Sequence, residues 1–183
     1  CPGWFPLAWV ALVPWLVVVR TGSRKAVFGG SFVAGMVAAG LGLSWQYIVT
    51  IPGAIGLTFC VGAYFPLFAA LVRLACGRLR LPFILAAPAV WTGTEYLRSW
   101  FLTGFPWLFL GHTQQPWTVL VQVCDLFGAY ALSFLVMAAN AWLAEAVVAW
   151  RARRAAASCP SPSGRGRGEG ASAPSPSGRG RGE

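Results

Sequence analysis

The chain has 183 residues, of which 57% are hydrophobic and 10% charged, and its mean hydropathy is +0.63. This composition excludes an ordinary soluble globular protein, in which about a quarter of the residues are charged. It favours a polytopic membrane protein, because each crossing of a hydrocarbon layer about 30 Å thick needs about 20 apolar residues. The five cysteines include no C-x-x-C pair, so they indicate neither a disulfide framework nor a zinc site.

Apolar segments bounded by charged or turn-forming residues predict an all-α integral membrane bundle of about five transmembrane helices within residues 1–154. The approximate ranges of these spans are 4–19, 26–49, 54–74, 82–97 and 129–150. Pro66 lies inside the third span and predicts a kink there. In the second span small residues recur every four positions, which predicts a stripe that lets another helix pack closely. The residues of this stripe are Gly30, Ala34, Ala38 and Gly42.

The net charge of +9 does not indicate nucleic-acid binding, because the basic residues form three separate clusters. These clusters are Arg20, Arg24 and Lys25; Arg73, Arg78 and Arg80; and Arg151, Arg153 and Arg154. They follow the first, third and fifth spans, and basic loops face the cytoplasm. The alternation therefore supports five spans and places loop 98–128 on the outer side of the membrane. Glu145, near the cytoplasmic end of the fifth span, is expected to pair with these arginines or to snorkel to the surface.

Residues 155–183 differ in character from the rest of the chain. Residues 157–169 and 171–183 are the same sequence apart from Cys159 in one copy and Ala173 in the other. Rich in Pro, Ser, Gly and Arg, this segment is predicted to be a disordered, low-complexity cytoplasmic tail. Its Gly-Arg units are compatible with RNA binding, although repeat sequence without a function of its own is the simpler interpretation.

The most distinctive stretch runs from residue 88 to residue 114 and begins as an apolar helix. Glu95 and Arg98 are three positions apart, so they share one helix face and are expected to form an ion pair. The segment 103–107, Thr-Gly-Phe-Pro-Trp, then prevents further helix while remaining apolar. A charged helix end followed by an apolar, non-helical loop is unusual in a membrane protein and points to a use for the charges.

The stretch resembles the membrane part of the apolipoprotein N-acyltransferases, and the resemblance covers about the first 150 residues. The matching residues in and around it are Pro88, Trp91, Glu95, Leu97, Arg98, Trp100, the run 103–107, Gly111 and Gln114. Further matches are Trp45 and Tyr47, followed by Gly128, Ser133, Phe134 and Leu135. His112 and Thr113 differ from the Tyr-Ser expected before Gln114.

This resemblance implies a multi-pass protein of the bacterial inner membrane, with loop 98–128 in the periplasm and no metal or cofactor. Members of the family carry a nitrilase-like domain outside the membrane, with a catalytic Glu-Lys-Cys set. The implied reaction moves an acyl group from a phospholipid to the cysteine thiolate, and then to the α-amino group of a diacylglyceryl-cysteine on an apolipoprotein. Phospholipid and apolipoprotein are therefore the implied partners.

The chain itself carries no such catalytic set. Lys25 is its only lysine and lies on the predicted cytoplasmic side, whereas Glu95 and Cys124 lie on the other side, about 30 Å away. We therefore expect a fragment: a membrane scaffold of the acyltransferase, without catalytic residues and inactive alone. The alternative is a non-enzymatic polytopic membrane protein, such as a small transporter or an assembly factor.

The residues expected to contact substrate or to line lateral access for lipid share aromatic or polar character and lie at the outer side. They are Trp45, Tyr47, Glu95, Arg98, Phe105, Trp107 and Gln114. Two structural alternatives stay open. Trp45 and Tyr47 are also typical of the aromatic belt at a membrane interface, and the charged pair with its loop could serve only to stabilise the fold.

Overall fold

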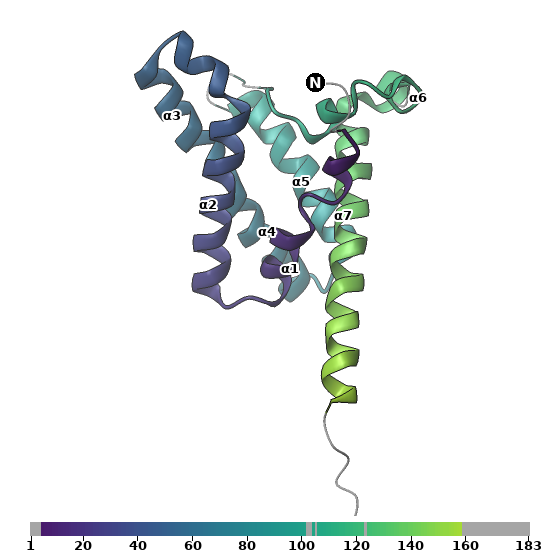
Figure 1. Cartoon of the computed structure of the whole chain (residues 1–183). Helices are drawn as coiled ribbons and strands as arrows, with labels where there is room; N and C mark the ends of the chain where they lie inside the picture. Colours follow the sequence, from purple (N-terminus) through teal and green to yellow (C-terminus); the bar gives the residue numbers. More distant parts are fainter. Residues whose placement is uncertain (1–4, 102–103, 105, 123, 159–183) are drawn as a thin grey trace, which may run out of the picture.

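The computed structural model describes residues 5–101, 104, 106–122 and 124–158, and over these residues it is helical without a β-strand (Figure 1). The 3-10 helices are η1 (Phe5–Trp9), η2 (Ser44–Ile48) and η4 (Leu110–Gln114). The α-helices are α1 (Val13–Thr21), α2 (Arg24–Gly42), α3 (Ile51–Gly62), α4 (Tyr64–Arg78), α5 (Phe83–Trp100), α6 (Thr118–Val121) and α7 (Cys124–Ala157). The predicted all-α fold class is confirmed.

Three helical segments of the described chain are long and apolar enough to cross a membrane. They are 24–42, 51–78, which joins α3 and α4, and 127–157, and a shorter apolar helix covers 6–21. Helix α5, the predicted fourth span, is not among them. The described chain therefore has three candidate membrane-spanning segments, while the count of five spans stays a prediction.

The break between α3 and α4 is the predicted effect of Pro66. Proline has no backbone N–H, so the carbonyl of Gly62, four residues earlier, receives no helical hydrogen bond from position 66. The helix is interrupted at Ala63, between the end of α3 and the start of α4. The Gly62 carbonyl lies against α2, where a Cβ added to Gly35 would be 2.4 Å from its oxygen. The kink is confirmed, and it brings two backbones into direct contact.

The buried face of α2 differs from the predicted small-residue stripe by one position. The buried residues are Val27, Ser31, Gly35 and Ala39. At Gly30 a Cβ would meet no atom within 4 Å, so this residue faces open space. The rotation has a polar cause, because the Ser31 hydroxyl is buried and accepts a 3.0 Å hydrogen bond from Trp15 Nε1. The predicted stripe was therefore right in part. Ala34 packs against the core and Gly42 packs closely against Leu108, whereas Gly30 is exposed and the most buried residues lie one position later.

The centre of the bundle is an aromatic cluster contributed by α1, α4 and α5. The ring of Trp15 lies 5.0 Å from that of Phe65, 5.1 Å from that of Phe68 and 6.1 Å from that of Trp91. Trp91 meets Phe65 and Phe68 edge-on, the geometry that aromatic quadrupoles favour. Met137 of α7 and Val27 of α2 are fully buried against the same cluster, so five helices share one core.

Helix α7 bends at Gly128, whose φ of 70° and ψ of −179° are not helical. A positive φ is accessible to glycine without the steric penalty that a Cβ imposes. The regular part of the helix therefore starts at residue 129, as predicted for the fifth span. It continues to Ala157, beyond the predicted limit of residue 154, and residues 159–183 of the predicted tail lie outside the described residues.

Asn140, in the middle of α7, is fully buried and was not singled out from the sequence. Its amide nitrogen donates to the Ala8 and Val136 carbonyls, both at 2.8 Å, and its oxygen accepts from the Leu12 backbone N–H at 3.1 Å. These bonds satisfy backbone groups where the chain passes from η1 to α1. A lone asparagine in an apolar helix was the available signal.

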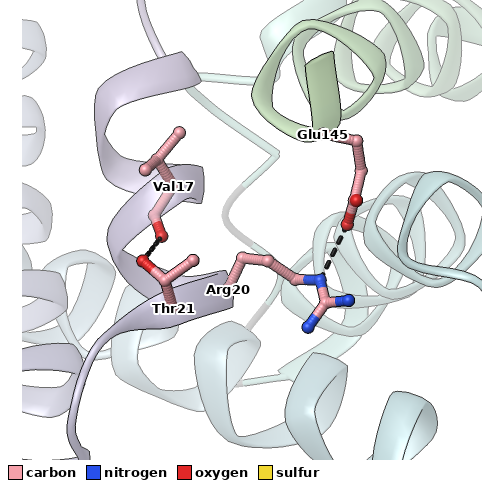
Figure 2. Close-up of polar contacts among 4 residues, drawn as sticks. All are labelled: Val17, Arg20, Thr21 and Glu145. Atoms are coloured by element: carbon pink, nitrogen blue, oxygen red, sulfur yellow. Dashed lines mark hydrogen bonds and ion pairs between the residues drawn. The ribbon is translucent and has the colours of Figure 1, made fainter. Parts of the chain in front are cut away.

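The three basic clusters lie at one end of the bundle, where α1 meets α2, where α4 ends and where α7 ends (Figure 1). Segment 106–122 and η2 lie at the opposite end. Figure 2 shows Arg20 Nε donating to Glu145 Oε1 at 2.7 Å, and the Thr21 hydroxyl donating to the Val17 carbonyl at the end of α1. The expected pairing of Glu145 with an arginine is confirmed.

The contact between Gly35 and Gly62 generates the first prediction. Gly35→Leu should destabilise the bundle by about 1–3 kcal/mol, because the new side chain overlaps the Gly62 carbonyl and forces α2 and α3 apart. Gly30→Leu, on the exposed face of the same helix, is the matched control and should change stability little. Thermal unfolding in detergent measures both, and equal losses for the two variants would contradict this packing.

Candidate functional site

The carboxylate of Glu95 is buried inside the end of the bundle opposite the basic clusters, with 2% of the residue exposed. Its Oε1 atom accepts two hydrogen bonds, from Trp91 Nε1 at 2.9 Å and from the Leu110 backbone N–H at 2.8 Å. The Ser133 hydroxyl of α7 is close to the same carboxylate, while Oε2 has no partner within hydrogen-bond distance among the described residues. Glu95 thus joins α5 to the start of η4.

Arg98, one turn later, is 7% exposed and binds the same returning segment. Its Nη2 atom donates to the Leu108 carbonyl at 3.3 Å. The guanidinium carbon lies 5.8 Å from the centre of the Tyr64 ring and 5.3 Å from that of the Phe109 ring, in cation–π geometry. The Nε atom is buried without a hydrogen-bond partner among the described residues.

The predicted ion pair between Glu95 and Arg98 does not form. Among the described residues, the ion pair whose nitrogen and oxygen atoms lie within 4 Å of each other is the one between Arg20 and Glu145, and not one between Arg98 and Glu95. The physical reason is that both side chains turn toward the backbone of residues 108–110, one accepting from an N–H and the other donating to a carbonyl. Their opposite charges still attract each other at longer range. The two residues fasten a loop together instead of neutralising each other by contact.

Helix η4 is held by contacts with α7 and with η1. The Gly111 N–H donates to the Ser133 hydroxyl of α7 at 2.8 Å, and a Cβ at Gly111 would be 2.7 Å from the Ala129 carbonyl. Gln114 is fully buried: its Oε1 accepts from Trp9 Nε1 at 3.0 Å and its Nε2 donates to Thr113 Oγ1 at 2.9 Å. Close packing against α7 therefore requires glycine at position 111. At position 114 the buried glutamine side chain is needed for its hydrogen bonds to Trp9 and Thr113.

Aromatic rings cover the outer edge of this segment. The ring centres of Trp45, on η2, and Trp107 are 5.1 Å apart, and half of Trp107 is exposed. The next residue, Leu108, has a φ of 59°, a conformation that costs a leucine free energy. Its side chain fills the space above Gly42, where a Cβ would be 2.6 Å from Leu108 Cδ2.

A hollow of about 460 Å³ has Trp107 in its lining. Its walls include Val61, Phe65, Trp91, Trp107 and Leu108, so they are mainly apolar, and Arg98 and His112 are also part of the lining. Burial lowers the pKa of His112, and the charge of Arg98 lowers it further, so His112 is neutral at pH 7. Chemically, the hollow suits an apolar chain with one polar or anionic group directed at Arg98.

The residues predicted from the sequence are only partly brought together. Glu95, Arg98 and Gln114 are buried and fix segment 106–114, and Trp45 and Trp107 stack at its edge. Tyr47, on η2, is 43% exposed and does not line the hollow, and Phe105 lies outside the described residues. Whether these residues contact lipid or substrate stays a prediction.

Several partners of the site were not predicted as site residues. They are Trp9, Tyr64, Trp91, Phe109, Tyr130 and Ser133. Ser99, for example, exchanges a 2.8 Å hydrogen bond with Tyr130 of α7. Most of these contacts join distant parts of the chain, so local spacing carried no signal for them. Trp91 was the exception, because it lies four residues before Glu95, on the same helix face.

Membrane-length apolar helices, with buried polar side chains hydrogen-bonded inside the bundle, define a helical integral membrane protein. A family model described as the apolipoprotein N-acyltransferase N-terminal domain matches residues 2–142. The chain belongs to the apolipoprotein N-acyltransferase family, and the resemblance read from its sequence is confirmed.

Curated relatives support the same assignment. An apolipoprotein N-acyltransferase of Geobacter metallireducens is 33% identical over 165 residues, covering 85% of this chain and 32% of the relative. One from Rhodopirellula baltica is 31% identical over 170 residues, covering 86% of this chain and 30% of the relative. One from Methylococcus capsulatus is 32% identical over 140 residues. The chain thus spans about a third of the length of the curated relatives it matches.

The hydrogen bonds of Glu95 generate the second prediction. Glu95→Ala should destabilise the protein by about 1–3 kcal/mol for each donor left unpaired, namely Trp91 Nε1 and the Leu110 N–H. Glu95→Gln keeps an acceptor oxygen at the same place and should lose clearly less stability. Thermal unfolding in detergent compares the two. If the glutamine variant is as unstable as the alanine variant, the negative charge matters more than the two accepted hydrogen bonds.

Proposed function

We propose that this chain is the membrane scaffold of an apolipoprotein N-acyltransferase, the activity that transfers an acyl chain from a phospholipid to the N-terminal diacylglyceryl-cysteine of lipoproteins. The observation that carries the proposal is the family match across residues 2–142. Phospholipid would be the acyl donor and apolipoprotein the acceptor. In this proposal the bundle binds and orients lipid, and the acyl transfer itself belongs to a Glu-Lys-Cys set elsewhere in the full-length enzyme.

The hollow beside Trp107 supports a role in lateral access for lipid. Its apolar walls fit an acyl chain, and the positive charge of Arg98, which is part of the lining, would attract an ester carbonyl or a phosphate oxygen. Trp45 and Trp107 would lie at the boundary between acyl chains and headgroups, where aromatic rings are favoured. Glu95 and Gln114 would then act indirectly, by holding the loop that forms one wall.

The proposed topology has five spans, with α5 as the fourth, in the bacterial inner membrane. Loop 98–128 would face the periplasm and the C-terminal tail the cytoplasm. The support is the location of all three basic clusters at one end of the bundle. Helix α5 is less apolar than the other spans because its far end carries Glu95 and Arg98, both of which are buried against neighbouring helices and satisfied largely within the protein.

We further propose that residues 1–183 alone have no transfer activity. Lys25 follows the first residue of α2, at the basic end, whereas Cys124 and Glu95 lie at the other end of the bundle. A 19-residue helix such as α2 is about 28 Å long, so these three groups are too far apart for concerted covalent catalysis.

The topology generates the third prediction. In a variant without its native cysteines, a thiol at the exposed position Gln115 should react with a membrane-impermeant maleimide in spheroplasts. A thiol at the exposed position Lys25 should react only after lysis, because positively charged loops are retained in the cytoplasm. Labelling of position 25 before lysis, with position 115 protected, would contradict the proposed orientation.

The fourth prediction tests the function with a chimera, in which residues 1–150 replace the corresponding part of the Geobacter metallireducens relative. In cells depleted of their own enzyme, the chimera should restore triacylated lipoproteins, whereas the 183-residue chain alone should not. Failure of a chimera that reaches normal membrane levels would argue against the scaffold proposal, and activity of the chain alone would contradict the catalytic argument.

The same chimera tests the lipid-access role. Trp107→Ala should reduce acyl transfer by about tenfold to 100-fold at unchanged protein level, since misplaced substrate lowers the rate steeply. The matched control is Trp142→Ala on α7, where the residue is 60% exposed and is not part of the lining of the hollow. Equal activities of the two variants would leave Trp107 with a structural role only.

A further inference from the structure

A second hollow, of about 510 Å³, lies between α2 and α4 at the basic end of the bundle. Three arginines line it: Arg24 at the start of α2, and Arg73 and Arg78 in the last turns of α4. Phe28 and Leu74 form its apolar wall. No acidic residue belongs to this lining. The hollow therefore combines concentrated positive charge with an apolar surface, at the opposite end from the family's proposed substrate region.

Within the described residues, no carboxylate neutralises the charge in this hollow. Among the described residues, the carboxylate at the basic end of the bundle is that of Glu145. Its Oε1 atom is 2.7 Å from Arg20 Nε, and Figure 2 shows this contact. Arg73 is held in place by a different contact, since its Nη1 atom donates to the Gly22 carbonyl at 3.0 Å. Arg24, Arg73 and Arg78 have no carboxylate within 4 Å among the described residues.

The start of α2 adds to the positive potential of the hollow. Ser23 caps this helix, its hydroxyl accepting from the Ala26 N–H at 3.4 Å. The first backbone N–H groups of a helix have no acceptor within the helix, and its macrodipole places partial positive charge there. Anions bind favourably at such a position, and Arg73 and Arg78 of α4 line the same hollow as Arg24.

The apolar wall distinguishes between kinds of anion. Phe28 is 42% exposed and Leu74 53% exposed, and both belong to segments apolar enough to cross the membrane. An inorganic anion gains nothing from such a wall, whereas a phospholipid places its phosphate beside its own acyl chains. Arginine suits this headgroup because its guanidinium forms paired hydrogen bonds with phosphate oxygens.

We propose that this hollow is a binding site for an anionic phospholipid, whose phosphate lies among Arg24, Arg73 and Arg78 and whose acyl chains lie along Phe28 and Leu74. The inference does not depend on acyl transfer, because the site is at the other end of the bundle from Trp107. The lipid held here would be a structural ligand that fastens α2 to α4 at the membrane surface.

The test is native mass spectrometry of the full chain released from detergent, with phosphatidylglycerol, phosphatidylcholine or inorganic phosphate added. We expect retained phosphatidylglycerol, and affinity about tenfold lower in the double variant Arg24→Gln/Arg78→Gln. The matched control is Arg151→Gln/Arg153→Gln, which removes the same charge from the end of α7 and should bind as the parent does. Equal losses in both double variants would show unspecific attraction and overturn the site.

A second variant tests the shape of the hollow without altering its charge. Gly77 lines the hollow, and a Cβ there would meet no atom within 4 Å, so Gly77→Leu fills the space without a clash in the unliganded protein. Gly93→Leu on α5, also in open space, is its control. Gly77→Leu should lower phosphatidylglycerol binding several-fold while unfolding in lipid-free detergent is unchanged. Unchanged binding, or equal retention of phosphatidylcholine or of inorganic phosphate alone, would overturn the proposal.

Discussion

One buried carboxylate determines how the end of this bundle is organised. Glu95 is almost completely excluded from solvent, and a charge in that position is costly unless donors surround it. The donors come from Trp91, in the same helix, and from the backbone of Leu110, fifteen positions along the chain. Segment 106–114 must therefore return across the helix ends. The charge has a structural consequence because the protein, and not water, supplies its hydrogen bonds.

The position of that returning segment determines the remaining features of the site. Once Leu110 is bound, Leu108 adopts a positive φ and its carbonyl reaches Arg98. Trp107 then lies against Trp45, on η2, and forms part of the wall of the hollow. The strain in the loop and the buried cation are thus tolerated because one hydrogen-bonded network supports both. A lipid-access role requires a wall held in this way, since a mobile one would not orient an acyl chain.

Composition and charge pattern were sufficient to predict the helical membrane class, the kink caused by Pro66, and the pairing of Glu145. The first two features depend on bulk hydropathy and on local chemistry. The charge pattern indicated that Glu145 would meet an arginine, but not that the arginine would be Arg20, 125 positions earlier. The buried face of α2 was predicted one residue away from its position in the structure. That position depends on the hydrogen bond between Trp15 and Ser31, which the spacing of small residues does not indicate. The ion pair expected from the spacing of Glu95 and Arg98 was wrong for a similar reason: helix periodicity places two side chains on one face, but backbone groups from elsewhere compete for them.

The amide of Asn140 has a consequence for the order in which the protein assembles. It binds Ala8 and Leu12, more than 120 positions earlier in the chain. During synthesis these N-terminal groups emerge long before α7 exists, so their hydrogen bonds to Asn140 can form only after residue 140 has been made. The start of the chain is thus fastened by a side chain that is added more than 120 residues later.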